Sequence, residues 1–168
     1  WRSGAIPGAP AELAVVRPVK GQLLHLRARD GSPWTAHNVR GLDVYVVSRP
    51  DGRVVVGATV EEKGGDVSVT AAGAHYLLDE ARRLVPDVGE LDFVEAIAGL
   101  RPGSPDNAPL LGETSVGGVL AATGHFRNGV LLAPVTATAI VDLLNGRSSV
   151  DVGAFSPRRF AAAPVMSR

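Results

Sequence analysis

The spacing of apolar residues predicts β-strands in the first third of the chain. From Val15, the stretch VVRPVKGQLLHLRA is rich in Val and Leu and indicates an extended segment with a break at Gly21. The stretch DVYVVSRPDGRVVVGATV contains two strand-like runs joined by SRPDGR, in which proline fixes φ and glycine accepts a positive φ. These runs predict an antiparallel hairpin. Because side chains alternate across a strand, Tyr45 and Val47 share one face of it and Val44 and Val46 the other.

A helical period appears twice further along the chain. In residues 70–86, Thr70 is a plausible N-cap, Pro86 is a stop, and the apolar residues at helical spacing are Leu77, Ala81, Leu84 and Val85. This segment predicts an amphipathic helix that covers the sheet. The second helix is expected from about Val130 to Asn145, where Asn145 and Gly146 form a C-terminal stop.

Pro134 constrains the start of the second helix, since an interior proline costs roughly 3 kcal/mol whereas one in the first turn costs little. We therefore expect this helix to begin near Val130. The N–H groups around Asn128 to Leu131 then lack intrahelical partners and carry partial positive charge. Either water or an electron-rich group, such as a phosphate, a carboxylate or a carbonyl-bearing heterocycle, can occupy the space before them.

The remaining segments have weaker patterns. Leu91 to Arg101 favours a strand, and the apolar GGVLAATG predicts a strand buried on both faces of a parallel sheet. Asp106 and Asn107 are interpreted as turn formers, and Glu61 and Glu62 as part of a solvated loop. His25, His37 and His75 show no metal-ligand spacing and are interpreted as structural or exposed.

Composition limits the possible functions. The chain has 168 residues, 45% of them hydrophobic, and its 17 basic and 17 acidic residues cancel. It can form a core, and no charge block indicates a nucleic-acid or membrane partner. The absence of cysteine excludes disulfides, thiolate metal sites and a cysteine-tethered cofactor within these residues. No segment is typical of a membrane span or signal peptide, so we expect a cytoplasmic protein.

Several motifs together resemble one family. GLRPGSPDNAPLLG followed by GHFRNGVLLAP is similar to the C-terminal region of the flavin-dependent amino-acid oxidases of the D-amino acid oxidase superfamily. The resemblance is greatest to the glycine oxidases of thiamine biosynthesis. VKGQLLHLR and YVVSRPDGRVVVGAT resemble the same family in the same order, so that the similarity extends from Trp1 to about Arg159.

The resemblance implies an α+β fold, in which an antiparallel substrate-binding sheet with a covering helix is joined to the returning strand and helix of an FAD domain. Accordingly, we expect residues 1–14 to be a linker, 15–98 the substrate-binding domain, 99–147 the C-terminal piece of the FAD domain and 148–168 a tail. No GxGxxG follows a strand. These residues are thus expected to form the C-terminal portion of an oxidase that binds FAD non-covalently, without its dinucleotide-binding half.

The family's functional residues carry over to matching positions. The resemblance implies that Arg101 binds the substrate carboxylate, that Tyr45 hydrogen-bonds it, and that Arg127 lies beside the amine end of the substrate. It also implies contacts with the flavin ring from the segment before and at the start of the second helix, namely His125, Phe126, Arg127, Asn128, Gly129, Val130 and Leu131. His125 is alternatively only a packing group. Arginine suits carboxylate binding because its planar fork makes two parallel hydrogen bonds.

The implied reaction oxidises a small amino acid with O₂ to an oxo acid, ammonia and H₂O₂. Two related alternatives stay open: a sarcosine or secondary-amine oxidase, and a dehydrogenase that uses another electron acceptor. An alternative of a different class is a catalytically silent fragment that acts as a binding module. We expect these residues alone to be inactive, and to self-associate or associate with the missing N-terminal half, since their apolar helix would otherwise lack neighbours.

Overall fold

The computed structural model describes residues 1–160 and divides the chain into two compact units. One unit holds Trp1–Val19 together with the described residues from Arg101 onward, and the other holds Lys20–Leu100. Both helices and antiparallel sheets are present, which confirms the expected α+β class. Whether the units correspond to the substrate-binding and FAD-domain parts stays a prediction.

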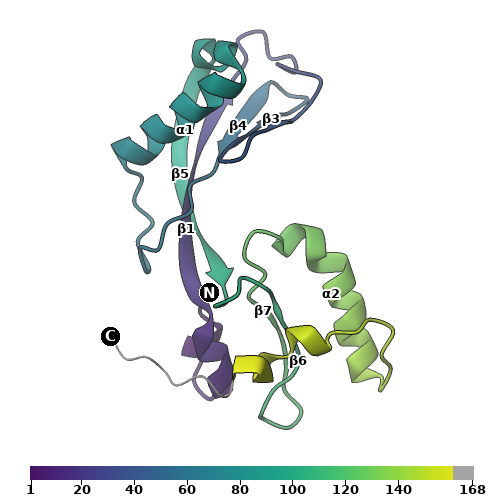
Figure 1. Cartoon of the computed structure of the whole chain (residues 1–168). Helices are drawn as coiled ribbons and strands as arrows, with labels where there is room; N and C mark the ends of the chain where they lie inside the picture. Colours follow the sequence, from purple (N-terminus) through teal and green to yellow (C-terminus); the bar gives the residue numbers. More distant parts are fainter. Residues whose placement is uncertain (161–168) are drawn as a thin grey trace. The chain divides into compact units, whose positions relative to one another are not determined.

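The Lys20–Leu100 unit is built on a five-stranded sheet (Figure 1). The strand order is β2-β3-β4-β1-β5. The strands are β1 (Arg17–Arg27), β2 (Val39–Arg40), β3 (Tyr45–Ser48), β4 (Arg53–Gly57) and β5 (Asp92–Gly103). β3 and β4 form the predicted antiparallel hairpin, and β4 also pairs antiparallel with β1.

One helix, α1 (Ala71–Leu84), lies against one face of this sheet (Figure 1). Its start is as predicted, because the Thr70 hydroxyl accepts a hydrogen bond from the Gly73 N–H at 3.1 Å. A short 3-10 helix, η3 (Pro86–Glu90), follows it. Alternate residues of the strands meet the helix in the core, which consists of Leu24, Leu26, Val44, Val46, Val54, Val56, Leu77, Ala81 and Val88. The apolar residues that alternate along the strands therefore form one side of the core, and the apolar residues at helical spacing in α1 form the other side.

A buried polar cluster extends this core, and the sequence interpretation missed it. Lys20 and Gln22 are each only 1% exposed. The Lys20 ammonium is 2.6 Å from Asp66, and the Gln22 amide donates to Glu61 at 2.8 Å and accepts from the Thr70 N–H at 2.8 Å. Because each of these polar groups has a partner, their burial is compatible with a stable fold.

Glu61 therefore does not belong to a solvated loop, and that expectation was wrong. Its backbone exchanges two hydrogen bonds with Lys20, each 2.9 Å long. Burial disfavours its charged form, but hydrogen bonds from Thr59 and Gln22 and the positive charge of Lys20 outweigh this effect and lower the pKa of Glu61. The signal was present in the strand alternation, which sets Lys20 and Gln22 on the same face as Leu24 and Leu26.

The other unit contains a two-stranded antiparallel sheet and one long helix. These elements are β6 (Leu110–Glu113), β7 (Leu120–Thr123) and α2 (Gly129–Leu144). The expectation of a parallel strand at GGVLAATG was wrong: β7 pairs antiparallel with β6, a strand that the sequence analysis did not predict. Ala121 is buried while Ala122 is exposed, so the strand is not covered on both faces within the described residues.

Helix α2 begins within one residue of the expected position, but Pro134 is not in its first turn. The helix starts at Gly129, which makes Pro134 its sixth residue. The proline nitrogen cannot donate the bond that this position would otherwise make to Val130. The premise that proline must occupy the first turn was therefore wrong, although it led to nearly the correct boundary.

The segments at the two ends of the chain pack more closely than expected. The predicted linker 1–14 includes the 3-10 helix η1 (Ser3–Ala5) and most of η2 (Ala11–Val15). Glu12 is buried and its carboxylate accepts a hydrogen bond from the Ser115 hydroxyl at 2.8 Å. In the predicted tail, η4 (Gly153–Phe155) and η5 (Pro157–Phe160) are formed, while residues 161–168 lie outside the described part.

The turn at Asp106 and Asn107 is confirmed and is tied to the tail. Asn107 has a positive φ of 57°, and the Asp106 carboxylate accepts from the Ala108 N–H at 3.0 Å. Arg159 donates to the same carboxylate at 3.0 Å and so holds the pKa of Asp106 well below its usual range. This ion pair links the turn after β5 to η5.

Removing the N-cap hydroxyl should destabilise the protein. Thr70→Val deletes the acceptor for the Gly73 N–H and a partner of Gln22, and we expect a loss of about 1 kcal/mol in the free energy of unfolding. Urea titration followed by circular dichroism measures this loss. Thr70→Ser keeps the hydroxyl and should unfold like the parent, whereas equal stability of the valine variant would disprove the capping role.

The Asp106–Arg159 pair should make stability depend on pH in acid. Because the pKa of Asp106 is lowered in the folded state, its contribution is fully present above the unfolded-state value of about 3.9 and disappears as pH falls through the lower folded pKa. The Tm difference between the parent and Asp106→Asn should therefore be greatest above about pH 5 and shrink below about pH 4. Scanning calorimetry at pH values from below about 4 to above about 5 tests this, and a constant difference over that range would contradict it.

Candidate functional site

The segment before helix α2 turns sharply at two positions. Gly124 has φ of 74° and Phe126 has φ of 50°. A side chain at residue 124 would also collide with Leu110, since an added Cβ would lie 2.8 Å from Leu110 Cδ1. Only glycine satisfies both constraints at this position. The Gly124–Asn128 loop thereby leads the chain from β7 into α2.

The first N–H groups of α2 have no intrahelical acceptor. Asn128 N–H donates to His125 O at 2.9 Å, and the first bond of the helical ladder runs from Leu132 N–H to Asn128 O at 2.8 Å. The N–H groups of Gly129, Val130 and Leu131 precede that bond. The expectation was therefore wrong for Asn128, whose N–H is already engaged in the turn, while the other three amides keep the expected position.

The start of α2 is also open and apolar. Val130 is 93% exposed and Leu131 77% exposed within this chain. An added Cβ on Gly129 would come no closer than 3.7 Å to another atom, the His125 Cβ. A flat apolar group bearing hydrogen-bond acceptors could therefore approach these amides, where the helix dipole favours negative charge.

The side chain of His125 connects the Gly124–Asn128 loop to helix α2. Its Nε2 lies 3.0 Å from the hydroxyl of Thr136, a residue that is 8% exposed. Burial lowers the pKa of His125 below its ordinary value, so the imidazole is neutral at neutral pH. The imidazole of His125 thus contacts Thr136 within the protein. Its contact with the flavin stays a prediction.

Backbone pairing brings together the segments that carry the two arginines. Gly103 at the end of β5 forms an antiparallel bridge with His125, and Phe126 N–H donates to Pro102 O at 2.8 Å. The pairing ends at Phe126, whose φ is positive, and Arg127 lies in the turn that leads into α2. Arg101 and Arg127 are thus each next in sequence to a residue of this contact, Pro102 and Phe126. Arg101 is half-buried and engaged with other residues of the structure, whereas Arg127 is exposed.

Tyr45 lies in the Lys20–Leu100 unit, at the start of β3. It pairs with Gly57 of β4, and its ring covers that glycine so closely that an added Cβ there would lie 2.9 Å from Tyr45 Cε2. It belongs to the predicted face, opposite the buried Val44 and Val46. Its action on the same substrate as Arg101 stays a prediction.

Two other kinds of site were considered in the described part of the chain. Residues 1–160 contain no group of three or more His, Asp or Glu side chains placed to hold a metal ion. None of the helices there combines the length and the apolar character that a bilayer crossing requires.

Comparison with known proteins places this geometry in a family. Residues 3–143 match the family described as FAD dependent oxidoreductase. The chain is 42% identical over 159 residues to the Bifunctional protein ThiO/ThiG of Synechocystis sp., covering 90% of this chain and 24% of that protein. It is 38% identical over 156 residues to Hydrogen cyanide synthase subunit HcnC of Pseudomonas protegens, covering 89% of this chain and 36% of that protein.

Solved structures agree with these sequence matches. The crystal structure of glycine oxidase from Geobacillus kaustophilus superposes with a TM-score of 0.81 at 34% identity, over 93% of this chain and 42% of that one. The chain thus spans less than half the length of each of these relatives. The family match over most of its length, together with the shared fold, shows that the chain belongs to the FAD-dependent oxidoreductase family.

Proposed function

We propose that this chain is the C-terminal portion of a flavin-dependent amino-acid oxidase of the glycine oxidase type. In this reaction a small amino acid is oxidatively deaminated: the amino acid, O₂ and water are consumed, and an oxo acid, ammonia and H₂O₂ are formed. The observation that carries the proposal is the pairing of Pro102 and Gly103 with His125 and Phe126, which brings the chain segments of Arg101 and Arg127 together immediately before the open end of α2. We also propose that the reaction serves thiamine biosynthesis, as the resemblance to those glycine oxidases implies.

The residues at the start of α2 fit the ring of a flavin. The amides of Gly129, Val130 and Leu131 are donors without helical acceptors, and the exposed Val130 and Leu131 side chains offer an apolar surface. When bound, the flavin supplies a two-electron acceptor for the oxidation. The helix terminus would stabilise the negative charge that develops on the ring's pyrimidine edge. Phe126, Arg127 and Asn128 complete the proposed ring-binding segment, braced by His125.

In this proposal, Arg101 fixes the orientation of the substrate. A bidentate contact between its guanidinium group and the amino-acid carboxylate is worth roughly 1.5 to 3 kcal/mol. This contact would select amino acids over plain amines by about one to two powers of ten. Arg127 would lie beside the amine end and favour the neutral amine over the ammonium, since a like charge disfavours protonation. A neutral amine needs no protein base, and none is assigned.

A second candidate is supported by the similarity to the Hydrogen cyanide synthase subunit. The name of that relative does not specify O₂ as the electron acceptor, so an enzyme that passes electrons to another acceptor is the second candidate. The proposed oxidase should release one H₂O₂ for each amino acid consumed in air. Turnover with an artificial acceptor but without peroxide would favour the second candidate.

The alternative of a catalytically silent module differs from the oxidase in one expected property, since it would bind no flavin. The full-length protein that contains this chain should be yellow, with flavin absorbance that persists through gel filtration. Val130→Asp sets a carboxylate among the free amides and should weaken flavin retention by charge repulsion and by competing for those donors. Val141→Asp, at an exposed position late in the same helix, is the matched control and should stay yellow. Colourless parent protein that cannot be reconstituted with FAD would support the silent module.

Substitution of Arg101 tests the substrate contact. Arg101→Met should raise KM for glycine at least tenfold, since it removes a charge-assisted contact from ground and transition state alike. Arg101→Lys should recover part of the loss because it restores the charge without the fork. Steady-state kinetics of the full-length protein measure both, with Arg82→Met on α1 as a distant control. A KM unchanged by Arg101→Met would refute the assignment.

A further inference from the structure

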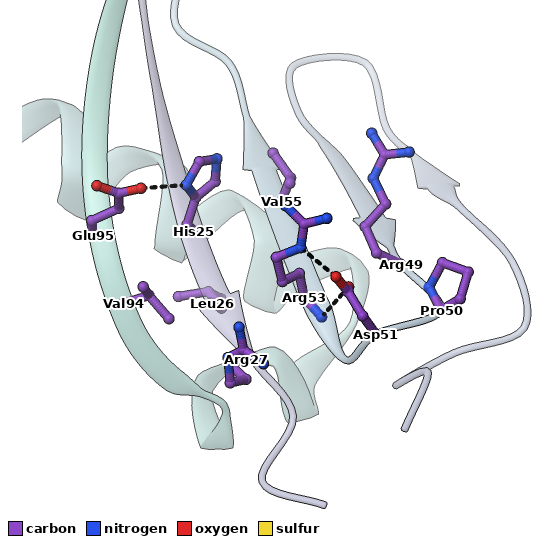
Figure 2. Close-up of a pocket in the computed structure, with 10 residues that line it drawn as sticks. All are labelled: His25, Leu26, Arg27, Arg49, Pro50, Asp51, Arg53, Val55, Val94 and Glu95. Carbon is purple, nitrogen blue, oxygen red and sulfur yellow. Dashed lines mark hydrogen bonds and ion pairs between the residues drawn. The ribbon is translucent and has the colours of Figure 1, made fainter. Parts of the chain in front are cut away.

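The Lys20–Leu100 unit has a second feature that the proposed function does not use. On the sheet face opposite α1, at the end where the β3–β4 hairpin turns, lies a cavity of about 670 Å³ (Figure 2). Arg27 of β1, Arg53 of β4 and Arg49 of the turn line it. Three guanidinium groups from three segments thus border one hollow.

Two of these arginines are directly opposite each other in the sheet. The register of β1 and β4 pairs Arg27 with Arg53. Like charges at directly opposed positions destabilise a pair of strands, and a nearby negative charge would offset this repulsion. Arg49 adds a third positive charge, and its N–H closes the hairpin by donating to Arg53 O at 2.8 Å.

The protein supplies one carboxylate to these three cations. Asp51 accepts from Arg53 Nε at 2.7 Å, and this hydrogen bond lowers the pKa of Asp51 and keeps it ionised (Figure 2). The other acidic group on the cavity, Glu95, has a carboxylate oxygen 2.8 Å from His25 Nδ1. Within residues 1–160, no carboxylate lies within ion-pairing distance of the Arg27 or Arg49 guanidinium group.

The cavity is lined by apolar as well as charged side chains. Val55 and Val94 line it between the charged groups (Figure 2). Its volume is within the range of about 300 to 1,000 Å³ typical of small-molecule sites. A phosphate group carries about −1.5 to −2 charge and three acceptor oxygens, so it matches several guanidinium groups better than a single carboxylate does.

We propose that the cavity bordered by Arg27, Arg49 and Arg53 binds the phosphate or pyrophosphate group of a small molecule. The apolar surface at Val55 and Val94 would contact the body of that ligand. Asp51 competes for Arg53 and therefore limits the affinity. The proposed site shares no residue with the substrate and flavin contacts assigned to Arg101 and α2.

Isothermal titration calorimetry with inorganic pyrophosphate, in phosphate-free buffer of fixed ionic strength, tests the site on the full-length protein. The parent should show saturable binding with one site per chain. Arg27→Gln and Arg49→Gln should each weaken it about tenfold, as expected for loss of one charge-assisted contact. Arg83→Gln on α1 removes the same charge at an exposed position and should change the affinity less than twofold.

Asp51→Asn should change the affinity for pyrophosphate in the opposite direction from the arginine substitutions. It releases Arg53 from its ion pair and should tighten pyrophosphate binding severalfold. Asp79→Asn, which breaks the comparable exposed pair with Arg83 on α1, adds the same net charge and should leave the affinity unchanged.

Three results would overturn the proposal. These are no saturable binding by the parent, equal weakening by Arg83→Gln, and tighter binding of a tetraglutamate peptide than of pyrophosphate. The last result would assign the cavity to an acidic polypeptide instead. Heat is measured without turnover, so none of these outcomes depends on whether the protein oxidises glycine.

Discussion

The antiparallel contact between the end of β5 and the loop before α2 is the constraint on which the candidate site depends. Gly103 pairs with His125, and the Phe126 N–H bonds to Pro102 O. Two segments separated by more than twenty residues are thereby held in one register. This contact lies directly before the turn at Asn128 that leads into α2, and it brings the segments of Arg101 and Arg127 together. Without it, Arg101 would have no defined position relative to the amides of Gly129 to Leu131.

A second set of contacts gives the other unit its shape. Gln22 lies beneath the start of α1 and bonds to Thr70 and Glu61, while Lys20 reaches Asp66. The positions of these side chains are strongly constrained, because loss of one hydrogen-bond partner of a buried polar group destabilises the fold by roughly 1 to 3 kcal/mol. This network ties the loop after β4 and the N-terminus of α1 to β1, so the helix packs over the Leu24 and Val56 side of the sheet. The opposite side carries Tyr45 and, farther along the strands, the arginine-lined cavity.

Local patterns in the sequence were sufficient for some of these features. Alternation located the β3–β4 hairpin, the N-cap at Thr70 located α1, and Pro134 placed the start of α2 to within one residue, although the premise about its position in the helix was wrong. Pairing between segments that are far apart in the sequence could not be predicted from local patterns. Whether GGVLAATG joins a parallel or an antiparallel neighbour depends on which strand reaches it, and its partner β6 is a four-residue run next to a proline-rich turn. The burial of Glu61 likewise depends on Lys20 and Gln22, which are forty residues away along the chain.

Residue-resolved hydrogen–deuterium exchange tests directly whether the free amides at the start of α2 hold the flavin ring. The full-length protein would be compared with and without FAD, with the amides of Ala71 and Ala72 in the first turn of α1 as an internal reference. We expect exchange at Gly129, Val130 and Leu131 to slow on FAD binding while the reference amides keep their rates. Unchanged exchange at all three positions in flavin-saturated protein would contradict this expectation.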